Sequence, residues 1–192
     1  MSIYPQYIQK QRFSAAICNW AEKSESRQQG IITKRINSSM HGYKNALKGR
    51  YTPKNPQKYI GDVNNIIYRS SLERRCMYRF DTEDMFLKWN SESVVIPYIS
   101  PIDQKCHMYH VDFLVKARRP DGTTVTRLIE VKPEYQCKEP IKQKKVTKKY
   151  LTEVMTWGIN QAKWKSATEY ALDQGWTFVI LTEKNIFPNR NR

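Results

Sequence analysis

The clearest alternation of hydrophobic and polar positions runs over residues 110–132 and predicts a β-hairpin. The run RRPDG at residues 118–122 is a turn signal, because proline and the Asp-Gly pair supply the backbone angles of a tight loop. Side chains repeat every second residue along a strand, so the hairpin has two distinct faces. One face is expected to carry Val111, Phe113, Val115, Val125, Arg127, Ile129 and Val131, and the other Asp112, Leu114, Thr126, Leu128, Glu130 and Lys132.

The second face of this hairpin holds two carboxylates and a lysine. With a loop at residues 118–122, Asp112 lies opposite Leu128, and Glu130 is its diagonal neighbour at roughly 7–8 Å. Two carboxylates at that separation suit one divalent cation, because hard cations prefer oxygen ligands. With Lys132 beside them, they have the spacing of a metal-dependent phosphodiesterase site. The pattern is short, and an exposed sheet face carrying a simple ion pair is an interpretation that stays open.

Residues 68–80 predict the first helix of the core. Apolar side chains repeat at Leu72 and at every fourth residue after it, which puts one apolar stripe on a helix. Ser70 and Glu73 fit a capping box at its start. Glu73 could therefore be a cap, a third acidic metal ligand or an aid to the attacking water. Three arginines flank it as candidate DNA contacts: Arg69, Arg74 and Arg75.

The remaining elements complete the order helix, three strands, helix and strand, which defines an α/β fold with a mixed sheet flanked by helices. They are a helix at 82–89, a strand at 93–101, a helix at 147–174 and a strand of the sheet interior at 176–182. Pro97 favours an edge position or a bulge for the first strand. The long helix is expected to be interrupted or kinked near Gly158 and to end at Gly175.

Residues 1–60 are predicted to form a basic, partly helical extension, with an amphipathic helix over residues 4–25. Basic and aromatic side chains alternate in its second half, which is typical of an arm that follows a phosphate backbone. Its candidate DNA contacts are Lys48, Arg50, Lys54 and Lys58. A solvated extension without a specific partner is the alternative. Residues 61–183 would then form the core, and residues 184–192 a loose polar tail.

The charge of the chain points to a polyanionic partner. Its 33 Lys+Arg residues outnumber 18 Asp+Glu residues, for a net charge of +15. Nucleic acid is the usual partner of such a chain, whereas a membrane surface or a purely structural role is also compatible with the charge. No apolar run approaches the roughly 20 residues of a membrane span, and no secretory signal is evident. Four scattered cysteines favour reduced thiols in an intracellular protein.

The order of elements and the acidic positions on the hairpin resemble the core of the PD-(D/E)XK nuclease superfamily. Asp112 falls at the family's aspartate, in VDF rather than PDF, and EVK at 130–132 falls at its (D/E)-x-K. Glu73 falls at the acidic residue of the first core helix. Val111 replaces the usual proline at a position that varies within the superfamily. TnsA-type transposon endonucleases share the Ser-Leu-Glu, Asp-Phe-Leu-Val and Glu-Val-Lys-Pro elements.

A closer resemblance, to the head completion nucleases of T-even-like bacteriophages, spans about residues 49–136. It runs through GRYTPKNPQKYIGD, IIYRSSLERR, WNSESVVIPYISP, YHVDFLVK and LIEVKPEYQ. It implies a virion-assembly protein that hydrolyses DNA near the portal of the packaged head, before the tail joins. The implied partners are double-stranded DNA or DNA ends and proteins of the head, portal or neck. The implied location is the host cytoplasm during assembly and then the virion.

The same resemblance implies a catalytic site. One Mg²⁺ or Mn²⁺ would be held by oxygen ligands: Asp112, Glu130, the backbone carbonyl of Val131 and Glu73. Lys132 would orient or deprotonate the attacking water, and Gln161 on the late helix would contact the scissile strand. Two other functions stay open: a non-catalytic DNA-end or portal-binding assembly factor on a nuclease fold, and an endonuclease of the transposon or restriction type.

Overall fold

The computed structural model describes residues 48–143 and 145–186. These residues belong to one compact unit that comprises residues 47–192. The helix predicted over residues 4–25, with the rest of the extension before Lys48, lies outside the described residues, as do residues 187–192. Within the described part of the chain, no helix is long and apolar enough to cross a membrane.

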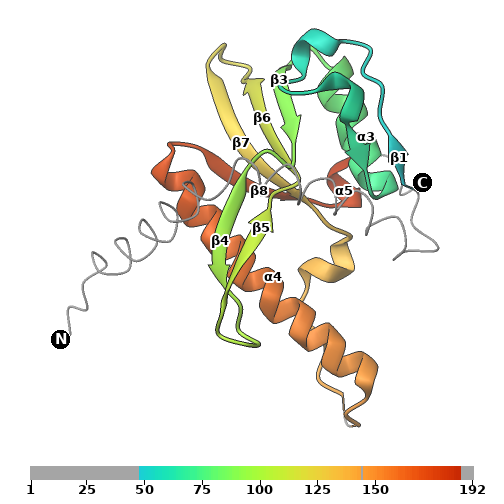
Figure 1. The fold of residues 1–192 in the computed structure, drawn as a ribbon, viewed down its shortest axis with the longest axis vertical. Coiled ribbons are helices and arrows are strands. Elements are labelled where there is room, and N and C mark those ends of the chain that lie inside the picture. The colour runs from blue at the N-terminus through green and yellow to red at the C-terminus, as the bar shows by residue number, and fades with distance from the viewer. Residues whose placement is uncertain (1–47, 144, 187–192) are drawn as a thin grey trace, which may run out of the picture. The chain divides into compact units, whose positions relative to one another are not determined.

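A four-stranded mixed sheet forms the centre of the fold (Figure 1). Its strands lie in the order β3 (Phe86–Ser91), β6 (Phe113–Arg118), β7 (Thr124–Val131) and β8 (Thr177–Leu181). The pairs β3–β6 and β6–β7 are antiparallel, whereas β7 and β8 are parallel. A parallel pair needs a long crossover, which helix α4 (Lys148–Asp173) provides. The predicted mixed α/β class is therefore confirmed.

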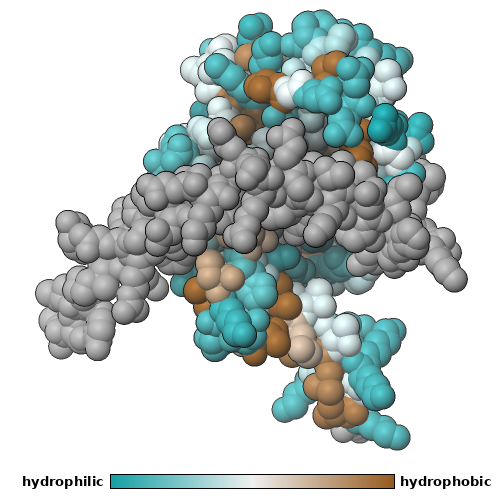
Figure 2. Space-filling view, viewed as in Figure 1, coloured by the Kyte–Doolittle hydropathy of each residue, from teal (hydrophilic) through white to brown (hydrophobic). Residues whose placement is uncertain are grey.

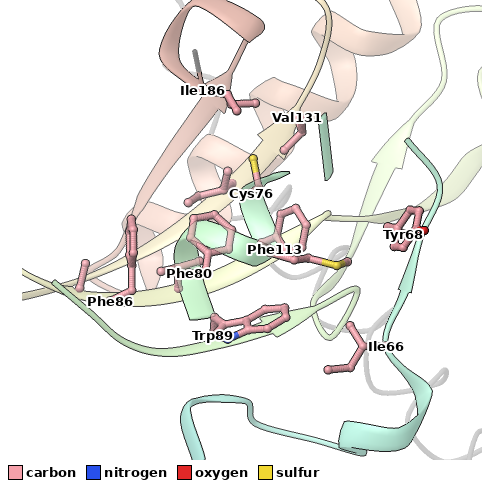
Figure 3. Packing of buried hydrophobic residues seen from close by; sticks show 13 residues of the cluster. Ile66, Tyr68, Cys76, Phe80, Phe86, Trp89, Phe113, Val131 and Ile186 are labelled. Atoms are coloured by element: carbon pink, nitrogen blue, oxygen red, sulfur yellow. The ribbon is translucent and has the colours of Figure 1, made fainter. Parts of the chain in front are cut away.

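Hydrophobic clusters lie on both faces of this sheet. Helix α3 (Ser71–Thr82) packs on one face, where Phe80, Trp89 and Phe113 meet in edge-on and tilted ring contacts (Figure 3). Helix α4 covers the other, where its Ala167 contacts the cluster around the fully buried Leu128. The sequence alternation predicts one buried face of the hairpin, whereas the structure buries apolar side chains on both faces.

The hairpin is confirmed, but its register differs by two residues from the prediction. Arg118 pairs with Thr124, so the five-residue loop covers residues 119–123. Phe113 consequently faces Ile129, and the next step along the ladder brings Asp112 beside Glu130 rather than Leu128. The turn signal locates a loop to within a residue, and moving a loop by one residue shifts the pairing by two.

The helix predicted at residues 82–89 is wrong. Helix α3 continues to Thr82, and β3 occupies Phe86–Ser91. The ladder between β3 and β6 has an irregularity between Phe86 and Lys88. One extra residue there lets Phe86 and Trp89, three apart, both turn toward the core, which imitates the spacing of a helix.

The strand predicted at residues 93–101 exists as β4 (Val95–Ile99), but it lies outside the main sheet. It pairs with β5 (Cys106–His110), which the sequence pattern did not predict, in a two-stranded ladder that contacts α4. Among the described strands, β4 pairs only with β5, so it is an edge strand. Pro97 is tolerated there because a proline, which lacks a backbone N–H, is found on edge strands. Val111 follows β5 and donates its backbone N–H to Val94, so its side chain joins the cluster near α4. Its predicted place on the same face as Phe113 is wrong.

Two further predictions about the C-terminal elements change. Helix α4 runs without interruption through Gly158, where an added Cβ would lie 3.6 Å from Pro101. Gly175 ends it with φ of 68°, as predicted. Strand β8 lies at the edge of the sheet with half-buried side chains, so its predicted interior position is wrong. An edge and an interior strand have similar apolar sequences when helices cover both faces.

Smaller elements complete the structure. They are β1 (Gly49–Arg50), β2 (Ile67–Tyr68) and α5 (Glu183–Ile186), with 3₁₀ turns at Pro56–Lys58, Val63–Asn65 and Glu134–Cys137. Ile186 is buried in the cluster under α3, so the predicted loose tail is packed at least to this residue. The projecting N-terminal end of α4 shows hydrophobic surface (Figure 2), to which Leu151, Val154 and Met155 contribute.

Candidate active site

Asp112 and Glu130 come together where β6 begins and β7 ends. Asp112 precedes β6, and its Oδ2 accepts a hydrogen bond of 2.7 Å from the backbone N–H of Val131. This contact ties the aspartate to the second strand of the hairpin. The backbone pairing and the side-chain contact therefore act together to set the position of both carboxylates.

Glu130 is 3% exposed and has a partner at each carboxylate oxygen. Its Oε1 lies 2.7 Å from Nζ of Lys132, which follows the last residue of β7. Its Oε2 accepts a hydrogen bond of 2.6 Å from the hydroxyl of Tyr109. A buried carboxylate is costly unless it is paired and hydrogen-bonded, and both conditions hold here.

Tyr109 is a site residue that sequence reasoning missed. It lies on β5, outside the main sheet, and is 3% exposed. Nothing in the spacing of the acidic motif points to it, and β5 itself was not predicted. Its proximity in sequence to Asp112 was the one available signal. The two rings of Tyr109 and Tyr98 lie under the ammonium group of Lys163, at 5.4 and 5.5 Å, which links this corner to α4.

The electrostatics of the site reflect two neighbouring acids, buried Glu130 and half-buried Asp112, that repel each other. Burial and the negative charge of Glu130 raise the pKa of Asp112 well above that of an ordinary aspartate. Burial alone would lower the pKa of Lys132, but the charges of Glu130 and Asp112 outweigh it, and the pKa is raised. Burial and the charge of Glu130 also raise the pKa of the Tyr109 hydroxyl. Lys132 is therefore protonated at neutral pH.

The donor set fits a hard divalent cation. Across residues 48–143 and 145–186 there is no cluster of three or more His, Cys, Asp or Glu side chains that could enclose a metal. The site instead has two carboxylates, whose mutual repulsion a cation would relieve. Magnesium keeps several of its waters and is commonly bound by one or two carboxylates, so this pair suits it.

Glu73 caps α3. Its Oε2 accepts a hydrogen bond from the backbone N–H of Arg69 at 2.8 Å, and its Oε1 accepts one from the Ser70 hydroxyl at 2.9 Å. Ser70 in turn accepts from the Glu73 N–H, which confirms the predicted N-cap. The charge of Glu73 still raises the pKa of Asp112, so the cap lies near the acidic pair. The structure thus shows Glu73 as a cap, and its role as a metal ligand or aid to the attacking water stays a prediction.

The predicted DNA-binding residues are not gathered in one place. Arg69 pairs with Glu92 on the loop after β3, and Lys58 donates from Nζ to the backbone oxygen of Glu83. Gln161 is exposed on α4. Three others line a cavity of about 400 Å³ between β1, β2 and α3: Arg50, Arg74 and Arg75. Of the remaining two, Lys54 stacks on Tyr78 at 5.6 Å and Lys48 is half-buried before β1.

The fold and the acidic pair agree with a comparison of the chain with known families. Residues 83–183, which include the whole hairpin and its carboxylates, match the family of TnsA-like endonuclease N-terminal domains. The chain belongs to the TnsA-like endonuclease family.

A relative makes the relationship more specific. The head completion nuclease of Enterobacteria phage T4 is 34% identical to this chain over 145 residues, which cover 73% of this chain and 94% of that protein. The chain is a homologue of that nuclease, as the resemblance found in its sequence implies. By this homology it is a nuclease, a hydrolase of phosphodiester bonds.

Proposed function

We propose that this protein is a Mg²⁺-dependent deoxyribonuclease that processes DNA during completion of a phage head. The observation that supports this most is the pair of half-buried Asp112 and buried Glu130, with Nζ of Lys132 2.7 Å from Oε1 of Glu130, on the hairpin that the family match covers. A structural ion pair would need one acid and one base. A second acid, half-buried beside the first and with a raised pKa, is costly unless a cation or substrate uses it.

Asp112, Glu130 and the backbone carbonyl of Val131 would hold the cation, and Glu73 would complete its shell directly or through water. When bound, the cation supplies Lewis acidity, which polarises a phosphoryl oxygen and lowers the pKa of a bound water. Tyr109 keeps the Glu130 carboxylate in one orientation through its hydrogen bond of 2.6 Å. A carboxylate fixed in this way needs no rearrangement when substrate arrives.

Lys132 acts as a cation in this site. Because the charges of Glu130 and Asp112 raise its pKa, it is protonated before a cation binds. It then donates hydrogen bonds to the water and to the phosphoryl oxygens on which negative charge grows. A bound divalent cation would offset the same two charges and lower the pKa of Lys132, which opens the role of proton acceptor only in the loaded enzyme.

The proposed substrate is packaged or end-exposed double-stranded DNA near the portal before tail attachment, with Gln161 contacting the scissile strand. The basic side chains would bind phosphates without selecting a sequence, so affinity should fall steeply with salt. Proteins of the head, portal or neck would place the nuclease there. The homology to a protein named for head completion supports this proposal.

The deciding experiment is cleavage of linear and circular DNA by wild type and Glu130→Ala with Mg²⁺, Mn²⁺ or EDTA. Wild type should cut only with metal, and Glu130→Ala should lose at least about 100-fold in rate, the scale expected for one electrostatic group at the reaction centre. Glu169→Ala, an exposed glutamate of α4, is the matched control and should cut like wild type.

Binding without cleavage under every metal would refute the nuclease and favour a non-catalytic assembly factor. Discrete fragments from long DNA would favour an endonuclease of the transposon or restriction type over one that processes ends. Comparing linear with circular DNA shows whether an end is required.

A further inference from the structure

A second basic site lies between the N-terminal strands and the outer face of α3. It is a cavity of about 400 Å³. We call this cavity the arginine pocket. Its lining includes three arginines and three tyrosines: Arg50, Arg74, Arg75, Tyr51, Tyr68 and Tyr78. The described residues that line it include no acidic side chain. Such a lining attracts an anion.

A buried aspartate of α3 fixes one wall of the pocket. Asp81 is fully buried, and its carboxylate accepts hydrogen bonds from the backbone N–H groups of Lys54 and Asn55, at 2.7 and 2.9 Å. It also accepts one of 3.0 Å from the Tyr51 hydroxyl. These contacts fasten the segment after β1 to the helix. Arg50 is thereby held across from the arginines of α3.

The pocket and the acidic pair use opposite sides of α3. Arg74 and Tyr78 are one turn apart and face the pocket. Glu73 and Cys76 lie on the other side, and both act electrostatically with Asp112. A helix is about 10–12 Å across with its side chains, so this thickness separates the pocket from the acidic pair. The pocket is therefore a distinct site.

Two of the arginines are held by aromatic rings. The guanidinium of Arg74 lies 5.6 Å from the centre of the Tyr68 ring, and that of Arg75 lies 5.5 Å from the centre of the Tyr78 ring. Stacking uses the flat face of a guanidinium and leaves its N–H donors around the edge, where phosphate oxygens bind. Ordering the side chains in advance reduces the entropy lost when an anion binds.

The size of the pocket limits its ligand. A volume of about 400 Å³ is at the lower end of small-molecule sites, which run from about 300 to 1,000 Å³. One nucleotide fits such a space, whereas a duplex, whose major groove alone is about 12 Å wide, does not. A phosphate within a duplex is also flanked by nucleotides on both sides, so a strand end enters more easily.

We propose that the arginine pocket binds the phosphate-bearing terminal nucleotide of a DNA strand. This rests on DNA being the substrate, as proposed above, but not on cleavage itself. Three guanidinium groups suit a terminal phosphate, which carries more negative charge than a phosphodiester. Held there, a strand end would lie about one helix thickness from the acidic pair, which would set where the nuclease cuts relative to an end.

The test measures binding in EDTA, where no metal-dependent cleavage takes place. The probes are fluorescent hairpin duplexes with one end that carries a 5′-phosphate, a 3′-phosphate or only hydroxyls, and a closed dumbbell without ends. Wild type should bind one of the phosphorylated ends about tenfold more tightly than the hydroxyl end, the effect expected from one or two charged hydrogen bonds. The two phosphorylated probes show which strand end is recognised.

Arg74→Ala and Arg50→Ala should each abolish this preference. Both residues are exposed, so circular dichroism should show an unchanged fold. Arg118→Ala removes an exposed guanidinium of β6 outside the pocket and should keep the preference.

Equal affinity of wild type for phosphorylated and hydroxyl ends would overturn the proposal. So would a loss in Arg74→Ala that is equally large for the dumbbell, because the pocket would then be a general backbone contact. A protein that prefers phosphorylated ends but never cuts would sustain the pocket and refute the nuclease, so the two proposals fail separately.

Discussion

Replacing Tyr109 by phenylalanine isolates the hydrogen bond that orients Glu130. The change removes one oxygen and keeps the ring, so it leaves the packing of β5 in place. The lost hydrogen bond is 2.6 Å long and serves a carboxylate that is 3% exposed. Hydrogen bonds to charged groups contribute about 1.5–3 kcal/mol. We therefore expect the free energy of unfolding to fall by about 2 kcal/mol in metal-free buffer.

Urea unfolding followed by circular dichroism measures this change, and the dependence on urea should keep its slope. For a chain of this size, a loss of 2 kcal/mol corresponds to a fall in Tm of about 4–8 °C. Tyr98→Phe is the matched control. Tyr98 is only 6% exposed and, like Tyr109, packs its ring against Lys163. The hydrogen bond to Glu130 comes from Tyr109 and not from Tyr98.

A double-mutant cycle with Glu130→Ala separates the hydrogen bond from other effects of the substitution. Without the carboxylate, removing the Tyr109 hydroxyl should cost almost nothing. The reasoning is refuted if Tyr109→Phe costs the same in both backgrounds, or no more than Tyr98→Phe.

Two other predictions concern Asp112 and Asp81. Folding raises the pKa of Asp112, so above about pH 4 the folded protein holds more protons than the unfolded chain. The free energy of unfolding without metal should therefore fall as the pH rises through the raised pKa of Asp112. Calorimetry should show that Mn²⁺ binding releases a proton and becomes tighter as the pH rises through the same range. Asp112→Asn should remove the pH dependence of both stability and Mn²⁺ binding. A wild type whose stability and Mn²⁺ affinity do not change with pH would contradict the assignment. Asp81→Asn should cost about 3 kcal/mol in urea unfolding, because an amide cannot accept both backbone N–H bonds from Lys54 and Asn55. The exposed Asp84→Asn should unfold like wild type, and equal effects of the two would disprove the anchoring role of Asp81.

Sequence periodicity predicted the elements whose signals are local. A period of two gave the hairpin, and a period of four with Ser70 at its start gave α3. Helix α4 and its glycine stop were equally plain. Strand β3 was not, because its irregularity beside Phe86 imitates helical spacing. A local pattern cannot distinguish a strand from a helix when one extra residue changes the period of the strand.

The amino-acid sequence by itself determined the chemistry that this protein can carry: two acids and a lysine on one hairpin, a strong positive charge and a family resemblance that the comparisons bear out. Tertiary structure alone decided that Asp112 faces Glu130, that Tyr109 orients the glutamate, and that Arg50 meets the arginines of α3. Each of these contacts joins separate elements. Their geometry depends on strand register and on the packing of helices, which no single stretch of sequence specifies.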